Sequence, residues 1–241
     1  MIAQAGFELR LLLRNGEQLL LTIAIPVALL LGVTYVAAVP LAASAGASRL
    51  PEALGSVLCV AVIASAFTAL AISVGFDRRS GALLMLATTP LSRMSILGAR
   101  ALATLGVVAI QTALLVGIAL AIGWRPTASA FTLVPSIIAG TAVFAALGFA
   151  LGGAVRAEAT LAVANAIFLA LVAIGGTTFP AASLPAPLST VVSALPSAAL
   201  GDLLRWATGF SAAPFVRVDA IVLLAWGIAG VLVARRTFSW R

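Results

Sequence analysis

Long apolar stretches separated by short polar interruptions make up almost the whole chain. Six of these stretches approach or exceed the roughly 20 residues that an α-helix needs to cross the hydrocarbon core of a bilayer. The predicted spans cover about residues 19–39, 56–74, 96–122, 131–155, 160–178 and 220–234. The pattern therefore predicts an all-α integral membrane protein with six transmembrane helices, in which residues 1–241 form a single transmembrane domain.

The first residues differ from the spans because they carry charge on an amphipathic pattern. In residues 2–15, Glu8, Arg10 and Arg14 alternate with apolar positions at helical spacing. Burying these charges in a bilayer is costly, so we expect a helix that lies along the membrane surface. The alternative is that this stretch is the beginning of the first span.

The apolar stretch between the fifth and sixth spans is broken in several places. Residues 179–215 contain Pro180, Pro185, Pro187, Pro196 and Gly201. One straight spanning helix cannot accommodate these breaks, so the sequence predicts a re-entrant or surface helical hairpin on the external side. Asp202 and Arg205 in this hairpin either gate the outer mouth or form an i,i+3 ion pair on a surface helix.

Composition excludes several classes of protein. The chain is 63% hydrophobic and only 9% charged, with a mean hydropathy of +1.21, which a soluble domain of this length could not sustain. The net charge of +7 is spread over the span ends without interleaved aromatics, so nucleic-acid binding is not expected. With no histidine and the single Cys59, no metal or haem site is expected.

Arginine counting orients the predicted spans. Ten arginines fall on the side of the two termini and only four on the other side (Arg49, Arg125, Arg205 and Arg217). The positive-inside rule therefore places both termini in the cytoplasm.

Residues 77–93 are the most conspicuous polar interruption. Pro90 disfavours helical geometry at Thr89, so a helix that begins near Ser80 is expected to end there. Leu83 and Leu86 are expected to face the membrane, while the arginines face the cytoplasm. An ordinary positive-inside loop explains the arginines equally well, but not the leucines or the Thr-Pro break.

The same segment carries a family resemblance. Phe76-Asp77-Arg78-Arg79-Ser80-Gly81-Ala82-Leu83, then Ala87-Thr88-Thr89-Pro90-Leu91-Ser92-Arg93, resembles ABC-2-type transporter permeases. The resemblance extends to Phe179-Pro180, Leu184-Pro185 and Leu195-Pro196, which look like the external hairpin of that family.

The resemblance implies the permease subunit of an ATP-driven exporter in the bacterial plasma membrane. Two permease chains, alike or different, would associate with two ATP-binding subunits that hold ATP and Mg²⁺, and this chain would bind no cofactor and would not be catalytic. Lysine, which a phosphate-binding loop requires, does not occur in the sequence. The resemblance implies contact with the ATP-binding subunits through a coupling segment, residues 77–93, and through a second turn at residues 156–158. The residues expected to make this contact are Asp77, Arg78, Arg79, Gly81, Leu83, Leu86, Thr89, Pro90, Arg93, Arg156 and Glu158.

Four polar residues lie inside the predicted spans: Ser65, Thr68, Gln111 and Asn165. Each is expected either to join neighbouring helices by hydrogen bonds or to line a substrate path. No charged residue lies in the middle of a predicted span, which argues against an ion-driven transporter. The substrate is therefore expected to be a hydrophobic or amphipathic compound such as a drug, lipid or glycolipid.

Two other classes of function stay open from the sequence. A membrane scaffold or immunity protein would bind partners without transport. A membrane enzyme acting on lipid would need histidine or paired carboxylates, but the carboxylates in the cytoplasmic segments are scattered.

Overall fold

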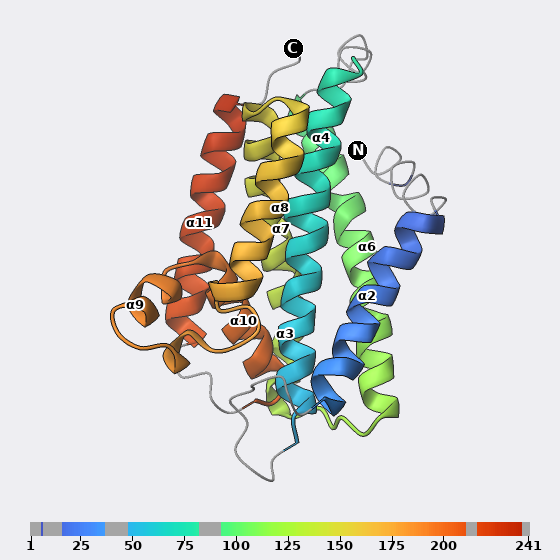
Figure 1. The fold of residues 1–241 in the computed structure, drawn as a ribbon, viewed down its shortest axis with the longest axis vertical. Helices are drawn as coiled ribbons and strands as arrows, with labels where there is room; N and C mark the ends of the chain where they lie inside the picture. The colour runs from blue at the N-terminus through green and yellow to red at the C-terminus, as the bar shows by residue number, and fades with distance from the viewer. Residues whose placement is uncertain (1–5, 7–15, 37–47, 82–92, 211–215, 238–241) are drawn as a thin grey trace.

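The chain forms a bundle of long helices, seen along its length in Figure 1. The computed structural model describes residues 6, 16–36, 48–81, 93–210 and 216–237. Its long helices are α2 (Gly16–Tyr35), α3 (Leu50–Val62), α4 (Leu70–Arg79), α6 (Arg93–Ala121), α7 (Leu133–Ala154), α8 (Ala157–Ile174) and α11 (Val216–Thr237). A π-helical segment, η1 (Ile63–Ala69), joins α3 to α4, and a short 3₁₀ helix, η2 (Ala128–Thr132), precedes α7.

The prediction of an all-helical membrane protein is confirmed for the described residues. Five of their helices are long and apolar enough to cross a membrane: 50–79, 95–121, 128–154, 157–174 and 216–237. The remaining predicted span corresponds to α2, of which Ile23–Tyr35 is a shorter apolar helix. Six spans therefore stay a prediction. The predicted surface helix over residues 2–15 lies outside the described residues, apart from Gly6.

Several span boundaries differ from the prediction; the sixth spanning helix, for example, runs from Val216 to Thr237 and not from 220 to 234. The second spanning helix runs from Leu50 to Arg79 and not from 56 to 74, because it continues through polar residues at both ends. The fifth ends at Ile174, before the expected residue 178. Gly176 follows with a φ of +73°, a conformation that glycine adopts readily and that ends the helix.

The connections place the helix ends in two groups (Figure 1). The beginnings of α2, α6 and α8 and the ends of α4, α7 and α11 lie at one end of the bundle. We call it the arginine-rich end, because Arg78, Arg79, Arg100, Arg156, Arg235 and Arg236 belong to it. The other end holds the helices between α8 and α11, and we call it the hairpin end.

Among the described residues, three short helices lie between α8 and α11: η3 (Ala181–Ser183), α9 (Leu188–Ser193) and α10 (Pro196–Ala207). Helix α10 packs against α3, α7 and α11, and almost all of its residues are buried. At Gly140 of α7 the approach is close, because a Cβ atom there would lie 2.6 Å from Leu200 Cδ1. The expected i,i+3 ion pair forms, with Arg205 Nη2 2.6 Å from Asp202 Oδ1. The expectation that it lies on a surface helix is wrong, because α10 inserts among the long helices.

Candidate functional site at the arginine-rich end

An ion pair joins helices α4 and α6 at the arginine-rich end. Asp77, in the last turn of α4, lies with Oδ2 2.6 Å from Nη2 of Arg100 in α6. The Arg100 side chain is only 9% exposed, so water screens this pair less than a surface pair. The end of α4 and the beginning of α6 are thus held together directly.

Arg78 reaches in another direction, to the end of α7. Its Nη1 donates hydrogen bonds to the carbonyl oxygens of Gly152 at 3.0 Å, Gly153 at 2.6 Å and Val155 at 3.4 Å. The last carbonyls of a helix lack partners within the helix and carry partial negative charge, so a guanidinium there is favourable. Gly152 lets the helices approach, because a Cβ atom at this position would lie 2.6 Å from the Ala71 carbonyl oxygen.

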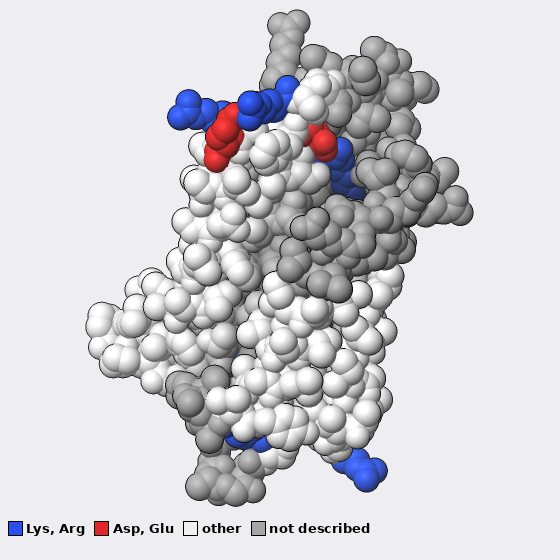
Figure 2. Space-filling model, turned by 45° about the vertical axis from the view of Figure 1, so that its right-hand side comes forward, with Lys and Arg blue, Asp and Glu red and all other residues white. Residues whose placement is uncertain are grey.

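Arg79, the residue that follows Asp77 and Arg78, points to α8. Arg79 pairs with Glu158 in the first turn of α8, and their side chains are 61% and 59% exposed. An exposed pair of this kind contributes little to stability. Arg156, just before α8, is also exposed. Figure 2 shows acidic and basic side chains gathered at this end of the molecule.

The predicted coupling residues therefore divide into two groups. Asp77 and Arg78 bind neighbouring helices, whereas Arg79, Arg156 and Glu158 lie on the surface. Gly81 ends α4 with a φ of +76°, and a Cβ atom there would meet open space. The rest of the prediction falls outside what the structure describes: Leu83, Leu86, Thr89, Pro90 and the side chain of Arg93.

Two of the four polar residues proposed for a substrate path meet. Ser65 Oγ in η1 donates a hydrogen bond to Gln111 Oε1 in α6 at 3.1 Å, and Thr68 is buried in the same π-helical segment. Asn165 is exposed and donates to the Leu161 carbonyl of its own helix at 2.9 Å. The structure thus brings Ser65 and Gln111 together and does not bring Asn165 to them by any described contact.

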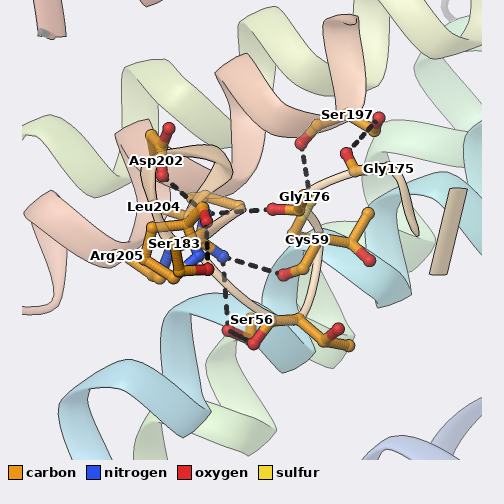
Figure 3. A network of polar contacts seen from close by, with 12 residues as sticks. Ser56, Cys59, Gly175, Gly176, Ser183, Ser197, Asp202, Leu204 and Arg205 are labelled. Atoms are coloured by element: carbon orange, nitrogen blue, oxygen red, sulfur yellow. Dashed lines mark hydrogen bonds and ion pairs between the residues drawn. The ribbon is translucent and has the colours of Figure 1, made fainter. Parts of the chain in front are cut away.

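A buried polar network at the hairpin end was missed by sequence reasoning (Figure 3). Arg205 of α10 is fully buried and donates to Asp202 Oδ1 at 2.6 Å. It also donates to the carbonyls of Gly176 at 3.0 Å and Thr177 at 2.9 Å, and to Ser56 Oγ of α3 at 3.4 Å. A signal for the ion pair existed, because Asp202 and Arg205 stand one helical turn apart.

Further contacts fasten α10 to its neighbours. Cys59 Sγ of α3 lies 3.6 Å from the Ser197 carbonyl oxygen, and Ser197 Oγ donates to the Gly175 carbonyl at 2.7 Å. Thr208 Oγ1 donates to the Pro51 carbonyl at 2.6 Å. The hairpin is therefore tied both to α3 and to the loop that follows α8.

The fold defines a polytopic helical membrane protein with a charged, cross-linked end and a short helix inserted at the other. A family model described as ABC-2 family transporter protein matches residues 39–236. The chain belongs to this family, and the resemblance noted in the sequence is confirmed. None of the curated proteins compared with the chain matches it. Membership makes the chain the permease component of an ABC transporter, a membrane subunit that associates with ABC ATP-binding subunits.

Proposed function

We propose that this chain is the membrane-spanning subunit of an ATP-driven exporter that moves a hydrophobic or amphipathic compound out of the cytoplasm or the inner leaflet. The arginine-rich end faces the cytoplasm and receives the ATP-binding subunits, two to a complex with a second permease chain. Family membership and the excess of arginine at this end support the proposal.

One observation carries the proposal. Three successive side chains at the end of α4 contact three different helices: Asp77 contacts α6, Arg78 contacts α7 and Arg79 contacts α8. Successive residues of an α-helix point about 100° apart, which is how one short segment reaches three neighbours. A partner that displaces the segment leaving α4 therefore acts on four helices together.

The surface group of charged residues provides the contact with the partner. Arg79 and Glu158 are more than half exposed, so they can exchange their mutual pair for groups on another protein at small cost. Arg156 lies exposed beside them in sequence. Asp77 and Arg78, by contrast, hold the receiving surface to the bundle.

The proposal is tested by co-purification with a candidate ATP-binding subunit. Arg79→Glu places a negative charge beside Glu158, and repulsion at an interface costs enough to weaken binding by about tenfold or more. Arg125→Glu is the matched control, because Arg125 is exposed beyond the other end of α6. Equal binding by both variants contradicts the docking site. A wild-type chain that binds no such subunit supports the scaffold alternative instead.

Transport is tested separately in liposomes. The assembled complex is expected to hydrolyse ATP faster when its substrate is present, so ATPase activity is measured across drugs, lipids and glycolipids. Deletion of Leu83–Leu86, within the coupling segment, is expected to abolish this stimulation. Stimulation that survives the deletion contradicts coupling through residues 77–93.

A further inference from the structure

One continuous helix connects the arginine-rich end to the hairpin end. Residues 50–79 comprise α3, η1 and α4 without a break. At the hairpin end, Ser56 accepts a hydrogen bond from Arg205 and the Pro51 carbonyl accepts one from Thr208. At the other end, Arg78 binds the carbonyls that end α7. Each end of this long helix is thus fastened to different partners.

The fastening at the hairpin end is close as well as polar. A Cβ atom at Gly55 would lie 2.7 Å from the Cα atom of Arg205 and 2.8 Å from its backbone nitrogen. Cys59 follows one turn later and contacts the Ser197 carbonyl. Helix α3 and helix α10 therefore meet backbone to backbone, so a displacement of α3 is felt directly by the hairpin.

The middle of the same helix is π-helical over Ile63–Ala69. A π-helical turn holds one more residue than an α-helical turn and replaces i→i+4 hydrogen bonds by i→i+5 bonds. Such segments are rare and occur frequently at functional sites. They are also one of the few identifiable causes of a sharp bend in a long helix.

Neighbouring helices leave room for this widened turn. On one side, Gly148 of α7 faces the carbonyl oxygens of Ala66 and Phe67, each 3.0 Å from where its Cβ atom would be. On the other side, Ser65 donates its hydrogen bond to Gln111 of α6. The buried Thr68 hydroxyl of the segment has no hydrogen-bond partner among the described residues.

From this arrangement we propose that η1 is a hinge through which the helix 50–79 transmits movement from the arginine-rich end to the hairpin end. The inference rests on the proposed function for the source of that movement. Conversion of the widened turn from i→i+5 to i→i+4 bonds, with the number of residues unchanged, rotates α3 relative to α4. Because α3 is fastened to α10, the hairpin moves when α4 moves.

The single cysteine is a natural reporter of this movement. Cys59 is fully buried between α3 and α10, on the hairpin side of η1. Its rate of alkylation by N-ethylmaleimide is measured in the complex with the ATP-binding subunits, with and without trapped ATP. We expect trapped ATP to raise the rate at least about fivefold, the lower end of typical coupling between sites.

Deletion of Ala64 is the decisive variant. Removing one residue converts the π-helical segment to an α-helix while the orientation of the residues at both ends is kept. The ATP response of Cys59 is expected to disappear although the complex still assembles. Ala64→Gly removes the same methyl group and keeps the residue count, so it is expected to respond as the wild type does.

A second variant serves if the deleted chain does not assemble. Gly148→Ala presses a methyl group against the Ala66 and Phe67 carbonyls and is expected to reduce the ATP response at least about fivefold. The hinge is contradicted by an undiminished response in an assembled variant, or by a wild-type complex whose Cys59 does not respond. Failure of the wild-type chain to bind ATP-binding subunits contradicts the proposed function instead, so the two failures are distinguishable.

Discussion

Replacing Arg205 by methionine is expected to destabilise the protein more than any exposed substitution. The guanidinium is fully buried and donates to Asp202, to the Gly176 and Thr177 carbonyls and to Ser56. Methionine fills a similar length without any donor. The change therefore leaves the buried Asp202 carboxylate without its cation and two backbone carbonyls without their donors.

The magnitude follows from these lost contacts. Removing one partner of a buried ion pair costs about 3–5 kcal/mol. The unsatisfied carbonyls each carry a penalty of about 1–3 kcal/mol, which overlaps with that figure because the neighbourhood relaxes. For a domain of this size, a loss of 1 kcal/mol in the free energy of unfolding lowers the thermal midpoint by about 2–4 °C. We therefore expect the midpoint of thermal unfolding to fall by about 6–20 °C.

The assay is thermal: the protein is heated in detergent, and the fraction that remains monodisperse is measured by size-exclusion chromatography. Arg125→Met is the matched control, because Arg125 is exposed, and it is expected to shift the midpoint little. The double variant Arg205→Met with Asp202→Asn is expected to lose less free energy of unfolding than the sum of the losses in the two single variants. Each single change leaves an uncompensated charge or dipole.

Equal shifts of the thermal midpoint by Arg205→Met and Arg125→Met would contradict a stabilising role for the buried Arg205 network. That role is also contradicted if the two changes at Arg205 and Asp202 are strictly additive, because contacting members of one network are expected to interact by about 0.5–3 kcal/mol.

Two further predictions concern the same end of the molecule. Gly55→Ala is expected to lower the free energy of unfolding by about 1–3 kcal/mol, because its methyl group must displace the Arg205 backbone. Gly117→Ala is the control, because Gly117 has open space around it. Equal thermal midpoints for the two variants would disprove the close approach. Trp124→Phe removes the indole N–H that donates to the Thr208 carbonyl at 2.8 Å and is expected to lower the free energy of unfolding by about 1 kcal/mol. A thermal midpoint within error of the wild type would contradict this hydrogen bond.

The long helices were predictable because each is an apolar run of spanning length. For α10 the sequence left two alternatives, a re-entrant or a surface hairpin, since a short helix that carries Asp202 and Arg205 also has the pattern of an amphipathic surface helix. In this fold its polar residues face inward, to carbonyls that Gly176 and Thr177 expose by ending α8 early. The position of polar residues in the sequence does not show whether they face water or the interior of the protein.

The sequence predicts the candidate site as one polar cluster and does not predict how its residues divide among the helices. Asp77, Arg78 and Arg79 form one polar cluster in the sequence, yet the structure directs them to three helices. Helical geometry alone separates consecutive side chains by about 100°, so it could have been predicted that the three residues contact different helices. The π-helical segment could not have been predicted, because Ile63–Ala69 contains no residue that requires a widened turn.

The central claim is that the ATP-binding subunit docks at the arginine-rich end, and crosslinking tests it most directly. Arg79→Cys and Arg125→Cys are each introduced into a Cys59→Ala chain, labelled with benzophenone maleimide, and irradiated in the assembled complex. We expect a crosslink to the ATP-binding subunit from position 79 and none from position 125. A crosslink from position 125, or an intact complex without one from position 79, would contradict it.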